Sequence, residues 1–265
     1  MNDLEIYCVT NERLKFLEDY NYNLSWVGLK NCPEGYIRSD TKKNIYIKEK
    51  FYSELTFHFW YWKNLLDLKS DNWIGFCQKR RFWVKKNHIH NSLKIKESLI
   101  TEPSEEWKDY DVILCKPIKV NDVKKMKMIK RGLRSIIKDP KIFFDKNKQS
   151  LKFHFDMHHG YGNLERAISK LDPQERDDFL KFVNESTSFN PHIMCITKPK
   201  ILNRWFEELF GWLEKCETIF DLKDLKGYDT QRLFAYLAER YMSFWFNKYY
   251  NVLDWPWTFY ENVEN

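Results

Sequence analysis

The stretch Asn72-Trp-Ile-Gly-Phe-Cys77 is short, apolar and bounded by turn-forming residues, which predicts a buried central β-strand. It runs directly into Gln78-Lys-Arg-Arg81, a polar and strongly basic turn. In sheets built of parallel strands, ligands bind where the strands end at their carboxyl edge. The sequence therefore predicts that Lys79, Arg80 and Arg81 stand where a ligand would bind.

Short apolar runs and amphipathic stretches alternate along the rest of the chain. The runs predict further strands over residues 5–10, 24–28, 111–115 and 192–197. The stretch 48–68 is apolar on nearly every side, which predicts a buried core helix. Further helices are predicted over 120–137, 163–171, 172–184, 199–216 and 229–247, the last capped by Asp229, with a loop at 158–162. No linker rich in Gly, Ser or Pro divides the chain. This alternation indicates one α/β domain over residues 1–265, with a mostly parallel central sheet flanked by helices.

Composition is typical of a folded protein from a reducing compartment. The chain has 265 residues, 43% hydrophobic and 31% charged, which excludes a disordered, fibrous or coiled-coil protein. Its six cysteines are scattered without a Cys-x-x-Cys pair, as buried thiols are. No signal peptide and no run of about eighteen apolar residues is found. We therefore expect a cytoplasmic protein.

Four sequence motifs follow one another along the chain. Tyr52-Ser-Glu-Leu-Thr-Phe-His-Phe-Trp-Tyr-Trp-Lys-Asn64 is followed by Trp73-Ile-Gly-Phe-Cys-Gln-Lys-Arg-Arg-Phe82. Phe189-Asn-Pro-His-Ile-Met-Cys-Ile196 and Gln231-Arg-Leu-Phe-Ala-Tyr-Leu-Ala-Glu-Arg240 come later. Over almost the whole chain this series resembles the bacterial domain-of-unknown-function family 4422.

The resemblance implies a fold and an activity. Members of that family are regarded as glycosyltransferases with a GT-A-like fold that act on capsule, lipopolysaccharide or exopolysaccharide. It implies a nucleotide-sugar donor, above all a UDP-sugar, and a glycan or lipid-linked glycan acceptor. Residues of about 1–118 would form the nucleotide-binding half and those of about 119–265 an acceptor-side helical half. The chain departs from the family at Gln78-Lys79 and at Ala235, which bears on donor or acceptor specificity.

Arg80 and Arg81 are candidates for binding the diphosphate. A sugar transferase must neutralise the charge that builds on its leaving group, and GT-A enzymes usually do so with a metal held by Asp-x-Asp. No Asp-x-Asp follows the central strand here. Guanidinium forks match phosphate oxygens, so we expect metal-independent binding by this pair and no resident metal. The alternative is structural, with one arginine paired to a core acid and the other facing solvent.

Glu239 is a candidate catalytic base. It follows Arg232 by seven residues, two turns along one helix face, so both side chains could face the same cleft. The alternative is an ion pair of Glu239 with Arg240 or Arg232 that only supports the fold.

Asp156 and His159 are the other candidate catalytic residues. With His158 they fall within four positions, a composition suited to acid/base chemistry or to a divalent metal. Asp156 is the second candidate base. The alternative is a loop of hydrogen-bonded histidines, because the spacing is not specific for a metal.

Further nucleotide contacts are expected from the fold class alone. Thr10, Asn11 and Arg13 follow the first strand, and Asp40 precedes a segment that resembles the family's Asp-rich loop. Glu54 lies amid an aromatic helix and needs a partner, for which Arg80 or Arg81 is the candidate.

Basic charge is concentrated in the middle of the chain. Residues 78–96 carry seven Lys or Arg and no acid, and residues 116–148 carry twelve against three acids. The basic helix over 120–137 could bind the anionic inner leaflet of the membrane, or it could present a solvated basic face over a buried apolar one. The rivals to a glycosyltransferase are an enzyme that transfers another group onto a surface polysaccharide and a non-enzymatic protein that binds polyanions or nucleic acid. We expect no nucleic-acid partner, because no nucleic-acid-binding signature occurs and the chain end is acidic.

Overall fold

The computed structural model describes residues 3–86 and 95–261. The chain divides into two compact units. Unit 1 comprises residues 1–116, 192–208 and 246–265, and unit 2 comprises residues 117–191 and 209–245. Two later segments of the chain, 192–208 and 246–265, thus belong to the same unit as residues 1–116.

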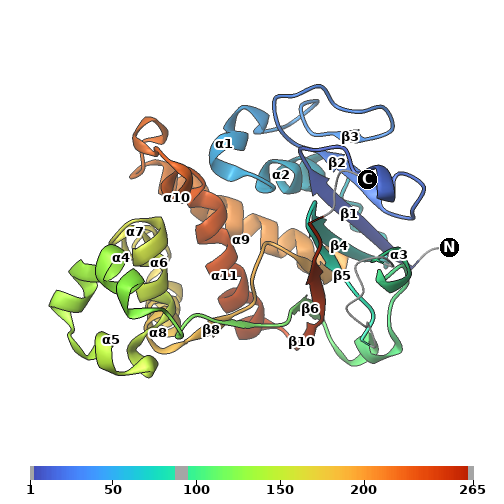
Figure 1. The fold of residues 1–265 in the computed structure, drawn as a ribbon. Coiled ribbons are helices and arrows are strands. Elements are labelled where there is room, and N and C mark those ends of the chain that lie inside the picture. Colours follow the sequence, from blue (N-terminus) through green and yellow to red (C-terminus); the bar gives the residue numbers. More distant parts are fainter. Residues whose placement is uncertain (1–2, 87–94, 262–265) are drawn as a thin grey trace. The chain divides into compact units, whose positions relative to one another are not determined.

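Unit 1 is built on a mixed β-sheet (Figure 1). Its main path runs β10-β6-β9-β4-β1-β2-β3, and all of these strands except β9 point in the same direction. The bounds are β1 Leu4–Thr10, β2 Asn23–Trp26, β3 Ile37–Arg38, β4 Trp73–Gln78, β6 Val112–Cys115, β9 Cys195–Thr197 and β10 Val252–Trp255. The expected α/β class with a mostly parallel central sheet is confirmed.

The register of the central strands brings their carboxyl ends to one edge. In the parallel pair β1 and β4, Val9 lies opposite Gln78, and in the pair β1 and β2, Thr10 lies opposite Trp26. The chain then turns back after β4 into β5 (Arg81–Trp83), which pairs antiparallel with β11 (Trp257–Phe259). The basic turn is therefore the tip of a hairpin at the carboxyl edge of the sheet.

The aromatic helix expected over 48–68 is broken. The chain forms a 3₁₀ turn η2 (Tyr46–Lys48), α1 (Glu49–Tyr52) and then α2 (Leu55–Asn64). Ser53, between the two α-helices, has φ 52°, a left-handed conformation that stops α1. The expectation of an all-round apolar helix is correct for α2, whose Phe57 and Tyr61 rings pack on Tyr7 of β1. The remaining short helices of unit 1 are η1 Lys15–Leu17, α3 Ile95–Ser98 and η4 Glu105–Asp109.

Unit 2 is mainly helical. Its helices are α4 Lys125–Lys138, α5 Lys141–Phe144, η5 Lys146–Lys148, α6 Leu151–His159, α7 Asn163–Ile168, α8 Pro173–Glu185, η6 Leu222–Asp224 and α10 Tyr228–Gln231, with the strand pair β7 Ile118–Lys119 and β8 Ser188–Phe189. Two longer helices, α9 (Pro199–Glu217) and α11 (Leu233–Tyr249), have residues in both units.

Four expectations for this region are wrong. The basic helix begins at Lys125 rather than Val120, and the segment around Asp156 is helix α6 rather than a loop, capped by the Ser150 hydroxyl. Asp229 lies inside α10 and does not cap the last helix. Arg232 has non-helical backbone angles and separates α10 from α11, so it does not share a continuous helix with Glu239.

Helix α4 packs closely on α6 through a glycine. A Cβ at Gly132 would lie 2.7 Å from Phe153 Cε2 and 3.1 Å from Met157 Cγ. We expect Gly132→Ala to lower the free energy of unfolding by roughly 1–2 kcal/mol, because overpacking outweighs the gain in helix propensity. Urea denaturation followed by circular dichroism measures this difference.

Gly211 in α9 is the matched control. It is exposed, and a Cβ there meets no atom within 4 Å. Gly211→Ala should therefore raise the stability by up to about 1 kcal/mol. Equal gains from both substitutions would contradict the close packing of α4 on α6.

Candidate functional site

A polar cluster occupies the carboxyl edge of the unit 1 sheet. Lys79 Nζ, from the hairpin tip after β4, donates to Asn11 Oδ1 at 2.8 Å and to Glu12 Oε1 at 2.6 Å. The loop after β1 is held by Thr10, whose hydroxyl donates to the Glu12 carbonyl and accepts from the Glu12 amide. The hydrogen bond from Lys79 lowers the pKa of the Glu12 carboxyl. The parallel pairing of β1 and β4 thus brings residues far apart in sequence into one site.

Arg80 and Arg81 lie at the same edge but in different surroundings. Arg80 Nη2 lies 3.9 Å from Glu12 Oε2, while its buried Nε has no hydrogen-bond partner within the described ranges. Arg81 Nη1 reaches Gln78 Oε1 at 3.4 Å, and its guanidinium lies 5.6 Å from the centre of the Phe259 ring. Arg80 therefore keeps donors that an anion could use, whereas Arg81 is partly committed to its neighbours.

Three predicted binding residues have other contacts. Arg13 forms a bidentate ion pair with Glu18, with N–O distances of 2.6 and 2.9 Å. Asp40 accepts in the same way from Arg38, at 3.0 and 2.5 Å. Glu54 immediately precedes α2, and no ion pair joins it to Arg80 or Arg81 in the part of the chain that the structure describes. The expected pairing of Glu54 with either arginine is wrong, because these arginines turn toward Glu12 and Gln78.

Unit 2 contains a cavity of about 550 Å³ that Asp156 lines, together with Lys152, Tyr161 and Glu165. The Asp156 carboxylate accepts from the Gly162 amide at 3.0 Å and from Lys152 Nζ at 3.2 Å. Burial raises the pKa of this carboxyl above its ordinary value, although both hydrogen bonds act in the opposite direction. A carboxyl with a raised pKa beside a cavity has the properties of a general base.

Glu239 and His159 are tied to other groups. The Glu239 carboxylate accepts from Arg240, so Glu239 forms the ion pair that the sequence left open as its alternative. His159 Nδ1 lies 3.0 Å from the Asp229 carbonyl, and its ring stacks on Tyr236 at 3.7 Å. Asp156, Glu239 and His159 thus each belong to unit 2, but only Asp156 lines this cavity.

The histidines of α6 pack around a buried arginine. Arg240 is 2% exposed, and its Nη2 lies 3.3 Å from His154 Nδ1. The His154 ring stacks on that of His158 at 4.5 Å. Burial lowers the pKa of His154 and of His159 to about 2, and Arg240 adds to the effect. These histidines are therefore neutral.

No group of three or more Asp, Glu, His or Cys that could hold a metal occurs within residues 3–86 and 95–261. Asp156, His158 and His159 each contact a different partner: Lys152 and the His154 carbonyl on α6, and the Asp229 carbonyl on α10. An Asp-x-Asp sequence does occur at Asp109-Tyr-Asp111, before β6, where Asp111 Oδ2 accepts from the Asn251 amide.

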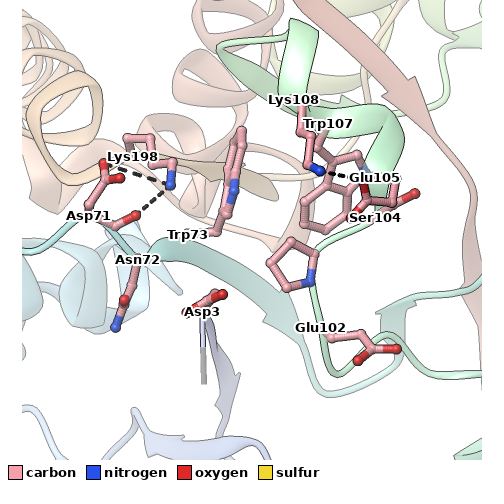
Figure 2. A pocket seen from close by; sticks show the side chains of 11 residues that line it. Asp3, Asp71, Asn72, Trp73, Glu102, Ser104, Glu105, Trp107, Lys108 and Lys198 are labelled. Atoms are coloured by element: carbon pink, nitrogen blue, oxygen red, sulfur yellow. Dashed lines mark hydrogen bonds and ion pairs between the residues drawn. The ribbon is translucent and has the colours of Figure 1, made fainter. Parts of the chain in front are cut away.

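A second cavity, also of about 550 Å³, opens at the opposite edge of the unit 1 sheet (Figure 2). Asp3 and Trp73, at the amino ends of β1 and β4, line it with Lys198. Lys198 Nζ lies 3.7 Å from Asp71 and 4.7 Å from the centre of the Trp73 ring. This cavity lies away from the residues that the sequence singled out.

Two residues of these sites were not among the predicted ones. Glu12 adjoins Asn11 and neutralises Lys79, and Lys152 sits one turn before Asp156. Lys152 and Asp156 are four residues apart, a spacing that predicts an ion pair on one face of a helix, so this contact could have been predicted from the sequence. No sequence signal identified Glu12, because its partner lies 67 positions away.

In open α/β sheets, ligands bind at the carboxyl ends of the parallel strands, and the basic cluster of unit 1 lies at that edge. The chain belongs to the family described as a domain of unknown function, DUF4422, which matches residues 5–250. The resemblance to this family expected from the sequence is confirmed.

The fold is similar to that of a solved glycosyltransferase. The structure is described as the apo form of the bifunctional glycosyltransferase WbbM, and its TM-score to this chain is 0.69 at 20% sequence identity. The match covers 98% of this chain and 46% of the WbbM chain, so this chain spans about half of its length. None of the curated proteins matches the sequence.

Proposed function

We propose that this protein is a glycosyltransferase that moves a sugar from a nucleotide-diphosphate sugar, a UDP-sugar above all, to a hydroxyl of a capsule or lipopolysaccharide precursor. The observation that carries the proposal is the cluster of Lys79, Arg80 and Asn11 at the carboxyl edge of the sheet. Family membership and the fold of WbbM support it.

Arg80 is proposed to bind the diphosphate of the donor. Its side chain is 41% exposed, and the distance from Nη2 to Glu12 Oε2 is 3.9 Å, too long for a hydrogen bond. A phosphate can therefore accept from the exposed Nη groups without displacing a short ion pair. Lys79 adds a second charge once a diphosphate competes with Glu12 for it. Arg81, Thr10 and Asn11 are proposed to complete the donor site, without a metal ion.

Unit 2 is proposed to serve the acceptor. Asp156 is the proposed general base, because it lines a cavity and has a raised pKa, whereas Glu239 is held by Arg240. His159 and Arg232 are proposed to stabilise the fold of unit 2 rather than to act in catalysis or donor binding. All six cysteines are free thiols, which supports the cytoplasm as the place of action.

A thermal-shift panel of nucleoside diphosphates and their sugars, with and without EDTA, tests the donor proposal. A ligand at a hundred times its dissociation constant adds about 2.7 kcal/mol of stability. We expect a selective shift from uridine diphosphates that survives EDTA. If none of the nucleotides shifts the melting temperature, or if polyanions of every kind do so, the rival polyanion-binding function is favoured.

Arg80→Ala is expected to weaken nucleoside diphosphate binding by roughly ten- to a hundredfold, since a charge-assisted hydrogen bond contributes about 1.5–3 kcal/mol. Titration calorimetry of uridine diphosphate measures the change. Arg176→Ala is the matched control, because the Arg176 side chain on α8 is 44% exposed and, among the described residues, its ion pair is with its neighbour Asp177 at 2.9 Å. Unchanged affinity in the Arg80 variant would contradict the assignment.

A further inference from the structure

Helix α4 presents large apolar side chains to solvent. Met126, Ile129, Leu133 and Ile137 are 65%, 44%, 51% and 72% exposed. At 3.6 residues per turn these four positions fall within an arc of about 80° on the helix. The next helix, α5, adds Phe144, which is 81% exposed. We call these five residues the apolar stripe.

The stripe faces outward because the inner face of α4 is made of smaller groups. Gly132 and Ser135 are buried there, and Gly132 lies against Phe153 and Met157 of α6. Met128 joins Phe153 and Met157 in a buried cluster, and the partly buried Ile136 packs against that cluster. The expectation of a buried apolar face beneath a solvated basic one is therefore wrong for the stripe.

Basic residues flank the apolar stripe. Helix α4 contains no acidic residue, and Lys127, Lys130, Arg134 and Lys138 are all exposed on the side next to the stripe. Arg131 is the exception among the described basic residues of this face, because its Nη1 pairs with Asp229 at 3.1 Å. The surface thus combines exposed aliphatic groups with positive charge. Helix α5, which carries Phe144, follows α4 and packs beside it (Figure 1).

We propose that the apolar stripe and its flanking basic residues form a docking surface for an anionic lipid bilayer. A basic helix of this kind lies in the plane of the interface, with its apolar face among the acyl chains and its lysines at the anionic headgroups. Charge complementarity selects the bilayer over a second copy of the chain, whose identical surface would be repelled. A nucleic acid would leave the five aliphatic and aromatic side chains in water. The proposal goes beyond the proposed function and does not depend on it.

Sedimentation of the full chain with vesicles tests the surface. We expect binding to vesicles that contain phosphatidylglycerol and little binding to vesicles of phosphatidylcholine alone. The double variant Ile129→Ser/Leu133→Ser should lower the partition coefficient by at least about tenfold, since each buried methylene contributes to membrane affinity. Lys130→Glu/Arg134→Glu should have a similar effect, and added salt should weaken the wild type.

Leu68→Ser/Lys69→Glu is the matched control, since it removes an apolar and a basic residue that are exposed in unit 1. It should bind as the wild type does. Circular dichroism and the thermal shift with uridine diphosphate show whether each variant is folded. Equal sedimentation of the stripe variant and the control, or no binding to phosphatidylglycerol vesicles, would overturn the proposal. The proposal would also be overturned if the wild type is a dimer in solution that does not bind vesicles and the stripe variant is a monomer.

Discussion

Acidification below about pH 6.5 is expected to unfold unit 2, because this unit contains two histidines that are neutral only while folded. Folding lowers the pKa of His154 and of His159 to about 2, chiefly through burial. In the unfolded chain each titrates near its ordinary value, so below about pH 6.5 the unfolded state binds more protons. Below this pH, the free energy of unfolding falls by about 1.4 kcal/mol per pH unit for each histidine. The two together give a slope of roughly 3 kcal/mol per pH unit.

The groups around these histidines reinforce the effect. Arg240 lies 3.3 Å from His154, and Lys127 and Arg131 lower the pKa values further. Glu239 is already paired with Arg240. Protonation of either ring would therefore add a buried positive charge beside existing ones. Among the described residues of this cluster, no unpaired carboxylate is placed to neutralise it.

Urea denaturation between about pH 7 and about pH 5 measures this slope. His154→Gln, which keeps an acceptor for Arg240, should lower the slope by about 1.4 kcal/mol per pH unit. His58 in unit 1 gives a comparison within the described residues: burial lowers its pKa to about 3, so it alone contributes about 1.4 kcal/mol per pH unit. A slope unchanged by His154→Gln would contradict a neutral His154.

Asp156→Asn is expected to lower kcat by roughly a hundred- to ten-thousandfold, the contribution typical of a general base. The amide keeps an acceptor for the Gly162 amide but cannot take a proton from an acceptor hydroxyl. The fold should persist, since the cavity and the Lys152 stem are retained. The assay follows release of nucleoside diphosphate from the donor that stabilises the protein, with a panel of oligosaccharide acceptors.

Glu165→Gln is the matched control for the Asp156 variant. Glu165 lines the same cavity and lies 3.5 Å from Lys152, but it is 43% exposed at its side chain. Its substitution should leave kcat within a few-fold of the wild type. Full turnover in the Asp156 variant would exclude the base role, and a loss confined to Glu239→Gln would transfer that role to Glu239.

The linear sequence predicted the features that depend on local patterns. The apolar run 72–77 becomes β4, residues 5–10 become β1, and Pro173 and Pro199 begin α8 and α9 as expected. Strands β10 and β11 were missed, because each is short and carries little alternation of apolar and polar residues.

Pairing across the sheet determined the candidate donor site. Strand periodicity placed Arg80 at a strand end, but Glu12 reaches Lys79 only because β1 and β4 are parallel neighbours in a particular register. Strands are stabilised by partners that are far apart in the sequence. Local composition therefore could not predict the contact of Glu12 with Lys79, or that Glu54 lies apart from the arginines.

The sequence by itself determined the family, the α/β class, the basic turn after the central strand and the basic amphipathic helix. Tertiary structure alone decided that Asp156 lines a cavity while Glu239 is held by Arg240, and that the apolar stripe of α4 faces solvent. Helical periodicity fixes which residues share a face. Which face is buried depends on the shape of the neighbour, and here Gly132 fits against Phe153 where a larger side chain would not.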